Sequence, residues 1–215
     1  MTRKRVGVLI SGRGSNLQAL IEACKEPHYP AEIVLVVSNV PGAQGLLRAE
    51  AAGILATAIN HKEFSSREEF DRALNGALED ANIEFLCNAG FMRLHTEGFV
   101  EQWRNRHINI HPSLLPSFKG LDTHARVLAA GVTLTGCTLH FVRKEMDDGP
   151  IVAQAAVPVL PSDTVESLAV RVLDVEHRLY PHALKLVASG AVRIEGETVV
   201  RTSAPEQPPL FSPPL

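Results

Sequence analysis

Short apolar runs alternate with amphipathic stretches through the first half of the chain, and this order leaves few folds open. Four runs are apolar on both faces, as in strands covered on both sides, and they span residues 6–10, 33–37, 55–59 and 85–88. Apolar residues recur at helical spacing near residues 17–24, 44–52, 67–78 and 96–103. Strands and helices in this order form a mostly parallel central sheet flanked by helices. We therefore expect a Rossmann-like α/β fold, which binds ligands at the carboxyl ends of its strands.

The pattern changes after residue 110. A helical stretch over residues 122–130 precedes two β-rich runs, at residues 133–142 and 151–157. The turn-forming sequence Asp147-Asp148-Gly149-Pro150 joins the two runs, which predicts that they pair as antiparallel neighbours. The sheet is thus expected to have an antiparallel extension in the C-terminal half.

A long helix is predicted after these runs. The capping-box pattern at residues 163–166 starts it, and apolar residues at helical spacing carry it towards residue 186, with a break or kink expected at Pro181. The proline-rich end fits an extended tail better than a core. We therefore expect a single domain over residues 1–202 and a tail over residues 203–215.

Composition and charge disfavour several classes of protein. The 215 residues match the length of one large α/β domain or of two small ones. A net charge of −3 gives no electrostatic reason to expect nucleic acid or an anionic membrane as partner. The apolar run after the basic start is too short for a signal peptide core or a membrane span. The 3 cysteines are widely spaced in apolar surroundings, which favours buried thiols in the cytoplasm over disulfides or a metal site.

A glycine-containing loop, Ser11-Gly12-Arg13-Gly14-Ser15-Asn16, follows the first predicted strand and precedes a predicted helix. This order directs backbone N–H groups and the positive helix end towards an anion, which favours phosphate. A dinucleotide-binding fold requires a third glycine where Leu17 stands and an acidic residue where Ser38-Asn39 stand, and the Gly-Lys-Ser/Thr ending of a triphosphate-binding loop is absent. A single phosphomonoester fits better, with a tight turn and helix cap as the alternative.

Asn109 and His111 lie two positions apart on a predicted strand that ends at Pro112, so their side chains share one face. The amide and a charged imidazole can both donate hydrogen bonds to an oxygen that becomes negative during acyl transfer. Asp147 lies in the turn after the β-rich run at residues 133–142, where its carboxylate can lie close to His111. Each residue alone is more often structural, but their joint occurrence favours direct transfer to an incoming amine.

Four motifs, at residues 11–17, 89–94, 109–116 and 146–150, resemble in order those of the phosphoribosylglycinamide formyltransferases. The motif Asn-x-His-Pro-Ser-Leu-Leu-Pro marks the wider family of folate-dependent formyltransferases, and the glycine loop points to the branch whose acceptor carries a ribose phosphate. The resemblance implies transfer of a formyl group from 10-formyltetrahydrofolate to the amine of glycinamide ribonucleotide, giving formylglycinamide ribonucleotide and tetrahydrofolate in purine biosynthesis. It implies no metal, and it leaves a homodimer open.

The resemblance also implies roles for individual residues. Asn109 and His111 would stabilise the tetrahedral oxyanion, while Asp147 would raise the pKa of His111 and help to move a proton from the amine towards folate N10. Glu176 would lie near the substrate amine and ribose, with a solvated helix face as the alternative. The phosphate-binding residues would be Gly14, Ser15 and Asn16. The folate-binding residues would be Arg67, Met92, Arg93, Leu94, His95, Asn109, Arg143, Lys144, Glu145, Met146 and Asp147.

Other interpretations stay open. A formyltetrahydrofolate hydrolase would use the same three polar groups with water as acceptor, but it has no need of the phosphate loop. A non-catalytic sensor of a phosphate ligand would need only the Rossmann-like sheet. A zinc enzyme is suggested by His107 and His111, without a third ligand at a recognisable spacing. Asn88 stands where an aliphatic residue is expected and His140 matches a family histidine, and the sequence assigns neither a role.

Overall fold

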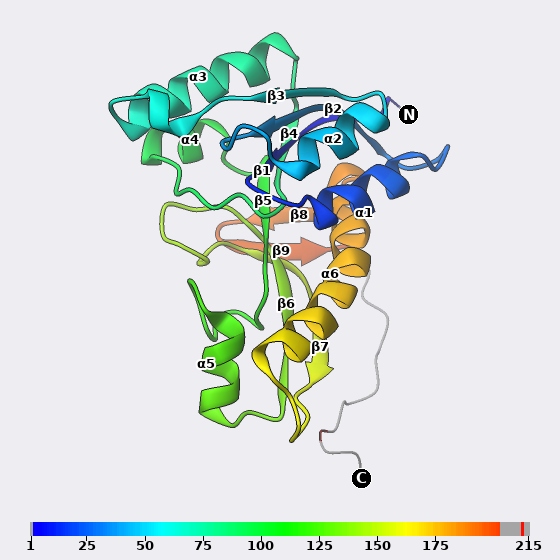
Figure 1. Ribbon diagram of the computed structural model, residues 1–215. Coiled ribbons are helices and arrows are strands. Elements are labelled where there is room, and N and C mark those ends of the chain that lie inside the picture. Colours follow the sequence, from blue (N-terminus) through cyan, green and yellow to red (C-terminus); the bar gives the residue numbers. More distant parts are fainter. Residues whose placement is uncertain (1, 203–211, 213–215) are drawn as a thin grey trace. The chain divides into compact units, whose positions relative to one another are not determined.

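The computed structural model describes residues 2–202 and Ser212 (Figure 1). Apart from Ser212, the predicted tail at residues 203–215 lies outside the described residues. The chain divides into two compact units: unit 1 comprises the described residues of Met1–Asn109 with Phe141–Lys144, and unit 2 comprises those of Ile110–His140 and Glu145–Leu215. The single domain expected over residues 1–202 stays a prediction.

Unit 1 contains the predicted alternation of strands and helices. Its strands are β1 (Lys4–Ile10), β2 (Ala31–Ser38), β3 (Leu55–Ala58), β4 (Phe85–Asn88) and β5 (His107–His111), whose last two residues belong to unit 2. They hydrogen-bond in the order β3-β2-β1-β4-β5, and all run parallel. The helices are α1 (Ser15–Cys24), α2 (Gln44–Ala51), α3 (Arg67–Asp80) and α4 (Glu97–Gln102), with a short 3-10 helix η1 (His61–Glu63). The predicted Rossmann-like, parallel arrangement is confirmed.

The sheet of unit 1 is buried on both faces. Leu9 of β1 packs in one buried cluster with Phe70 and Leu74 of α3. Val8 and Ile10, which alternate with Leu9 along the strand, point to the opposite face and are also fully buried. Burial on both sides explains why the strand sequences are apolar throughout.

Unit 2 contains the antiparallel part of the fold. Strands β6 (Leu134–Phe141), whose last residue belongs to unit 1, and β7 (Ile151–Pro158) pair antiparallel around the turn at residues 147–150, as predicted. The unit also contains helices α5 (Thr123–Ala130) and α6 (Val165–Ala188) and a hairpin of β8 (Val192–Glu195) and β9 (Thr198–Arg201).

Helix α6 begins at Val165, within the predicted range, and continues through its proline, but its capping box lies one position later than the pattern at residues 163–166. Thr164 caps it by accepting the N–H of Ser167, whose hydroxyl accepts the N–H of Thr164 in return. The break expected at Pro181 is wrong, because the helix runs without interruption for 24 residues, whereas the alternative of a kink stays a prediction. Tyr180 and Leu184 beside it are fully buried, so packing of this face offsets the backbone hydrogen bond that a proline removes. Neither α6 nor any other helix among the described residues is long and apolar enough to cross a membrane.

The three cysteines, Cys24, Cys87 and Cys137, are free and buried, as predicted. Burial raises the pKa of Cys24 to about 11 and that of Cys137 to about 12. These two thiols are therefore protonated and unreactive near neutral pH, since the thiolate is the nucleophile.

Candidate active site

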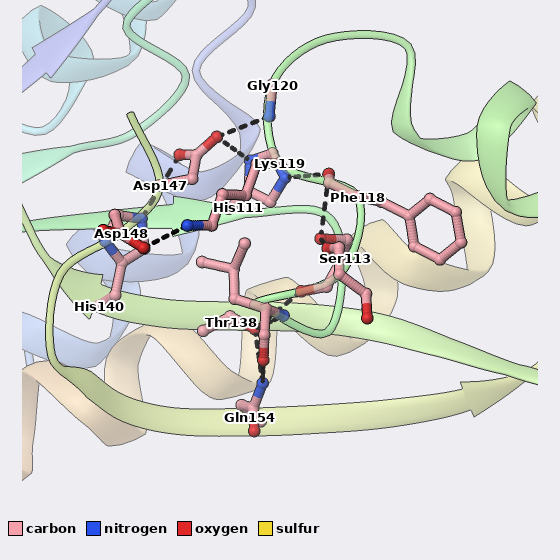
Figure 2. Close-up of polar contacts among 12 residues, drawn as sticks. His111, Ser113, Phe118, Lys119, Gly120, Thr138, His140, Asp147, Asp148 and Gln154 are labelled. Atoms are coloured by element: carbon pink, nitrogen blue, oxygen red, sulfur yellow. Dashed lines mark hydrogen bonds and ion pairs between the residues drawn. The ribbon is translucent and has the colours of Figure 1, made fainter. Parts of the chain in front are cut away.

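His111 ends β5 as a buried side chain with a partner at each ring nitrogen (Figure 2). Its Nδ1 lies 3.2 Å from Oδ2 of Asp147, and its Nε2 lies 2.9 Å from the backbone oxygen of Phe118. A carboxylate and a carbonyl only accept hydrogen bonds, so a neutral ring with one N–H can satisfy only one of them. The doubly protonated ring satisfies both. The site is therefore arranged to hold a second proton on His111.

Asp147 lies in the turn between β6 and β7 with a left-handed backbone, at a φ of 55°, which Asp tolerates better than most residues. Its Oδ2 also accepts the N–H of Gly120 at 2.9 Å, and its Oδ1 lies 3.6 Å from Nε2 of His140. The turn thus holds the carboxylate against His111, as the sequence predicts, and adds two further nitrogen neighbours.

Burial dominates the pKa of His111. It lowers the pKa below the ordinary value, because the charged ring loses hydration, and the Phe118 carbonyl and the Asp147 carboxylate oppose this only in part. The expectation of a raised pKa is therefore wrong in its net direction, although Asp147 acts with the expected sign. Burial also acts to raise the pKa of Asp147, but the contact with His140, the N–H of Gly120 and the charge of His111 together lower it. Near pH 7 the pair is thus an ionised carboxylate beside a neutral ring.

Replacing Asp147 with asparagine should lower the pKa of His111 further, because the carboxylate is one of the groups that raise it. Asp148→Asn is the matched control, since Asp148 lies in the same turn but pairs with Lys119. NMR titration of the His111 ring in both variants measures the effect. Equal shifts in the two variants, or no shift in either, would show that the Asp147 carboxylate does not act on this ring.

Two further histidines of unit 2 lie near this pair. His140, on β6, is 2% exposed and faces Asp147 as described above. His124, near the start of α5, has its pKa lowered first by burial and then by the charge of His111. The sequence alone assigns neither His140 nor His124 a role. Both histidines follow the Asn-x-His motif along the chain, but no local pattern connects them with His111.

The segment after His111 is tied to β6 and β7 through Thr138 (Figure 2). The Thr138 hydroxyl donates to the carbonyl of Ser113 at 2.7 Å and accepts the N–H of Leu115 at 3.0 Å. The amide of Gln154, on β7, donates to Thr138 Oγ1 and to the carbonyl of Leu115, both at 2.9 Å. Buried backbone groups next to His111 are thereby satisfied, which gives the imidazole a rigid support.

Asn109 lies on β5 two positions before His111, and the alternation of a strand turns both side chains to one face. His107, at the start of β5, has its Nε2 at 2.9 Å from Oδ1 of Asn88, and both side chains are buried. This contact explains why an amide replaces the expected aliphatic residue at position 88. Over residues 2–202 and 212, no group of three His, Cys, Asp or Glu side chains is arranged to hold a metal ion.

The glycine loop of unit 1 leads directly into α1. Gly14 is the N-cap residue at a φ of 70°, and a Cβ added to it would lie 2.7 Å from the Cα of Gly45. Ser15 and Asn16 begin the helix, whose first N–H groups Gly14 cannot cap because it has no side chain. Helix N-termini bind anions through such N–H groups, and phosphate binding by Gly14, Ser15 and Asn16 stays a prediction.

The apolar residues implied for folate differ in their exposure. Met92 is 74% exposed and Leu94 is 56% exposed, so both can contact a ligand. The His95 ring is instead buried and stacked between Phe91 and Phe99, with ring centroids 5.0 and 4.4 Å away. Its side chain belongs to the core of unit 1, which leaves only its backbone for the expected folate contact.

Among the basic residues implied for folate, Arg67 is exposed at the first position of α3, whereas the other three have partners within unit 1. The partners are the Phe70 ring for Arg93, the Asn105 amide for Arg143 and the Glu97 carboxylate for Lys144. A folate carboxylate would therefore displace no such protein partner if it paired with Arg67.

Unit 2 supplies the remaining implied residues. Glu145 and Met146 are exposed immediately before Asp147. Glu176 is 7% exposed on α6, so the solvated helix face considered for it is wrong. A buried carboxylate is uncommon without a structural or chemical role, which keeps Glu176 a candidate.

Comparisons with known proteins agree with these features. A model of the family described as formyl transferase matches residues 4–184. The phosphoribosylglycinamide formyltransferase of Haemophilus influenzae is 40% identical over 192 residues, which cover 89% of this chain and 91% of that protein. The crystal structure of glycinamide ribonucleotide transformylase 1 from Symbiobacterium toebii superposes with a TM-score of 0.91 at 45% identity, covering 94% of this chain and 95% of that one.

Two other relatives differ in length or activity. The trifunctional purine biosynthetic protein adenosine-3 of Gallus gallus is 56% identical over 190 residues, which are 88% of this chain but only 19% of that protein. The structure of a formyltetrahydrofolate deformylase from Burkholderia mallei superposes with a TM-score of 0.83 at 28% identity, covering 94% of this chain and 71% of that one. The deformylase is thus the more distant of the two kinds of enzyme.

Proposed function

The chain belongs to the formyl transferase family, on its phosphoribosylglycinamide formyltransferase branch, and we propose that it transfers the formyl group of 10-formyltetrahydrofolate to the amine of glycinamide ribonucleotide. The observation that carries this proposal is the buried His111 ring, held between Asp147 and the Phe118 carbonyl with a place for a second proton. The reaction requires such a group, because the amine loses a proton when it attacks the formyl carbon.

Asn109 and His111 stabilise the charge that forms on the formyl oxygen. As the amine nitrogen bonds to the formyl carbon, the carbonyl electron pair moves to that oxygen, which accepts hydrogen bonds from the Asn109 amide and the His111 ring. Nε2 of the ring now faces the carbonyl oxygen of Phe118, and the oxyanion would take the place of this carbonyl once the ring carries a proton at Nε2. The electron pair then returns, the bond between carbon and N10 breaks, and N10 receives a proton. Because side chains stabilise the charge, the reaction needs neither a nucleophilic serine or cysteine nor a metal.

His111 and Asp147 together hold the proton that the amine releases. The neutral ring holds its one proton at Nδ1, towards the ionised Asp147, so it can accept the amine proton at Nε2, and the carboxylate stabilises the resulting cation. The proton is then passed on to folate N10, either directly or through water. His140 faces the other oxygen of Asp147 and keeps that carboxylate oriented.

The two substrates are bound by different groups. The phosphate of glycinamide ribonucleotide is bound at the start of α1 by Gly14, Ser15 and Asn16. Glu176 attracts the amine of the acceptor. The exposed side chains of Met92 and Met146 contact the pterin of the folate, and the Arg67 guanidinium pairs with the carboxylate of its glutamate. The enzyme is expected to act in the cytoplasm, where its free thiols stay reduced.

A single assay separates this function from that of a hydrolase. The purified chain is incubated with 10-formyltetrahydrofolate, with and without glycinamide ribonucleotide, and both formylated nucleotide and free formate are measured. We expect product only with the nucleotide and little formate without it. Release of formate at the same rate in both reactions would replace the transferase with the deformylase activity.

A further inference from the structure

We propose that helix α2 holds the phosphate loop in its binding conformation, with Arg48 as a positioning residue for the phosphate of the acceptor. The proposal rests on the proposed function, since it assumes an acceptor with a phosphate. Helix α2 follows β2 in unit 1, and Gly45 near its start lies against Gly14 of the loop.

The backbone of α2 touches the loop at Gly45. The N–H of Gly45 donates to the carbonyl of Gly12 at 3.0 Å. A Cβ on Gly45 would lie 2.5 Å from Cδ1 of Ile10 and 3.2 Å from the Cα of Gly14, and a Cβ on Gly14 would approach Gly45 even more closely. Both positions therefore require glycine for the helix and the loop to come into contact.

Arg48, one turn further along α2, holds the next carbonyl of the loop. Its Nε donates to the carbonyl of Arg13 at 2.9 Å, and its Nη1 donates to the side-chain oxygen of Gln18 on α1 at 3.3 Å. The guanidinium thus joins the loop to both helices that flank it. It does so through a backbone atom of the loop, so the side chain at position 13 is not part of this contact.

Two successive carbonyls held from one side determine the direction of two N–H groups. In a trans peptide the N–H points opposite to the C=O of the same plane. Because the carbonyls of Gly12 and Arg13 face α2, the N–H groups of Arg13 and Gly14 face away from it. Successive N–H groups with a common direction form an anion-binding concavity. Arg48 therefore acts on phosphate binding through the loop.

Three substitutions of Arg48 separate this role from a direct effect of its charge. Arg48→Gln places an uncharged N–H donor where Arg has Nε, whereas Arg48→Met places a methyl group there. Arg48→Lys keeps the charge but has a methylene at that position. We expect Arg48→Met and Arg48→Lys to raise the KM for glycinamide ribonucleotide by about five- to tenfold, the effect of one hydrogen bond, with kcat and the KM for the folate unchanged. Arg48→Gln should stay within about twofold of the wild type.

The control for loss of charge is Lys25→Ala, because Lys25 lies exposed just after α1 and its ammonium pairs with Glu22. The proposal is overturned if Arg48→Gln is as impaired as Arg48→Met while Arg48→Lys is normal, because the charge would then act on the phosphate directly. It is also overturned if all three variants have the wild-type KM.

Amide hydrogen exchange without substrate gives a second readout that does not depend on the reaction. Exchange in residues 12–16 should be faster in Arg48→Met than in Arg48→Gln, and equal rates would overturn the positioning role. A wild-type chain that formylates no glycinamide ribonucleotide would instead refute the proposed function, and the exchange rates would still show whether Arg48 holds the loop.

Discussion

Replacing His111 with alanine should lower kcat by a factor of about 10²–10³ or more, because the change removes one oxyanion donor and the group that takes up the amine proton. The phosphate loop belongs to a different segment of the chain, so the KM for glycinamide ribonucleotide should change little. Steady-state kinetics with each substrate varied in turn measure both effects. His28→Ala is a suitable control, since His28 is an exposed histidine outside the candidate site. Near-normal turnover in the His111 variant would refute the mechanism.

The neighbours of His111 should show how the catalytic groups are coupled. Asn109→Ala and Asp147→Ala should each lower kcat severely, since one removes a donor and the other leaves the imidazolium without its carboxylate. The double variant His111→Ala with Asp147→Ala should be little worse than His111→Ala alone, because residues that act as a unit are not additive. In a double variant of Asn109 and His111, the two factors by which kcat falls should instead nearly multiply, because each residue donates its own hydrogen bond. If the effects of the His111 and Asp147 substitutions on kcat multiplied fully in the double variant, the two residues would be shown to act separately.

Replacing Gly14 with valine should raise the KM for glycinamide ribonucleotide by about 10- to 100-fold, with little change in the KM for the folate. Valine is strained at the φ of 70°, and its Cβ would lie 2.7 Å from the Cα of Gly45, so the loop must move away from α2. Gly12→Ala is the matched control in the same loop, because a Cβ there meets nothing within 4 Å. Kinetics are measured after thermal unfolding has shown that the variants are folded. Equal increases in both KM values would make the loop purely structural.

The sequence predicts well those features that depend on short-range pattern. The alternation of apolar runs and helices identified the parallel strands of unit 1, and the Asp-Asp-Gly-Pro turn identified the β6–β7 pair. Asn109 and His111 were found because two positions on a strand determine a shared face. The approach of Asp147 to His111 was found from turn chemistry together with the family resemblance.

Features that depend on tertiary burial were not predictable in this way. The direction of the His111 pKa is set by how deeply the ring is enclosed, which no local pattern contains. The same applies to His95, which lies among aromatic rings, and to Pro181, where packing of the neighbouring side chains keeps the helix intact. His124 cannot be connected with His111 from the sequence, because the two rings act on one another only in the folded unit.

The buried cysteines make the chain convenient for site-specific labelling. Thiol-reactive dyes modify the thiolate, so Cys24 and Cys137, with pKa values of about 11 and 12, should remain unlabelled in the folded protein near neutral pH. Cys87 is fully buried, so a cysteine introduced at Leu47, which is 64% exposed on α2, would then carry a fluorophore without removal of the native residues. Its emission could report on the phosphate loop in real time, because Leu47 precedes Arg48 on the helix that contacts that loop.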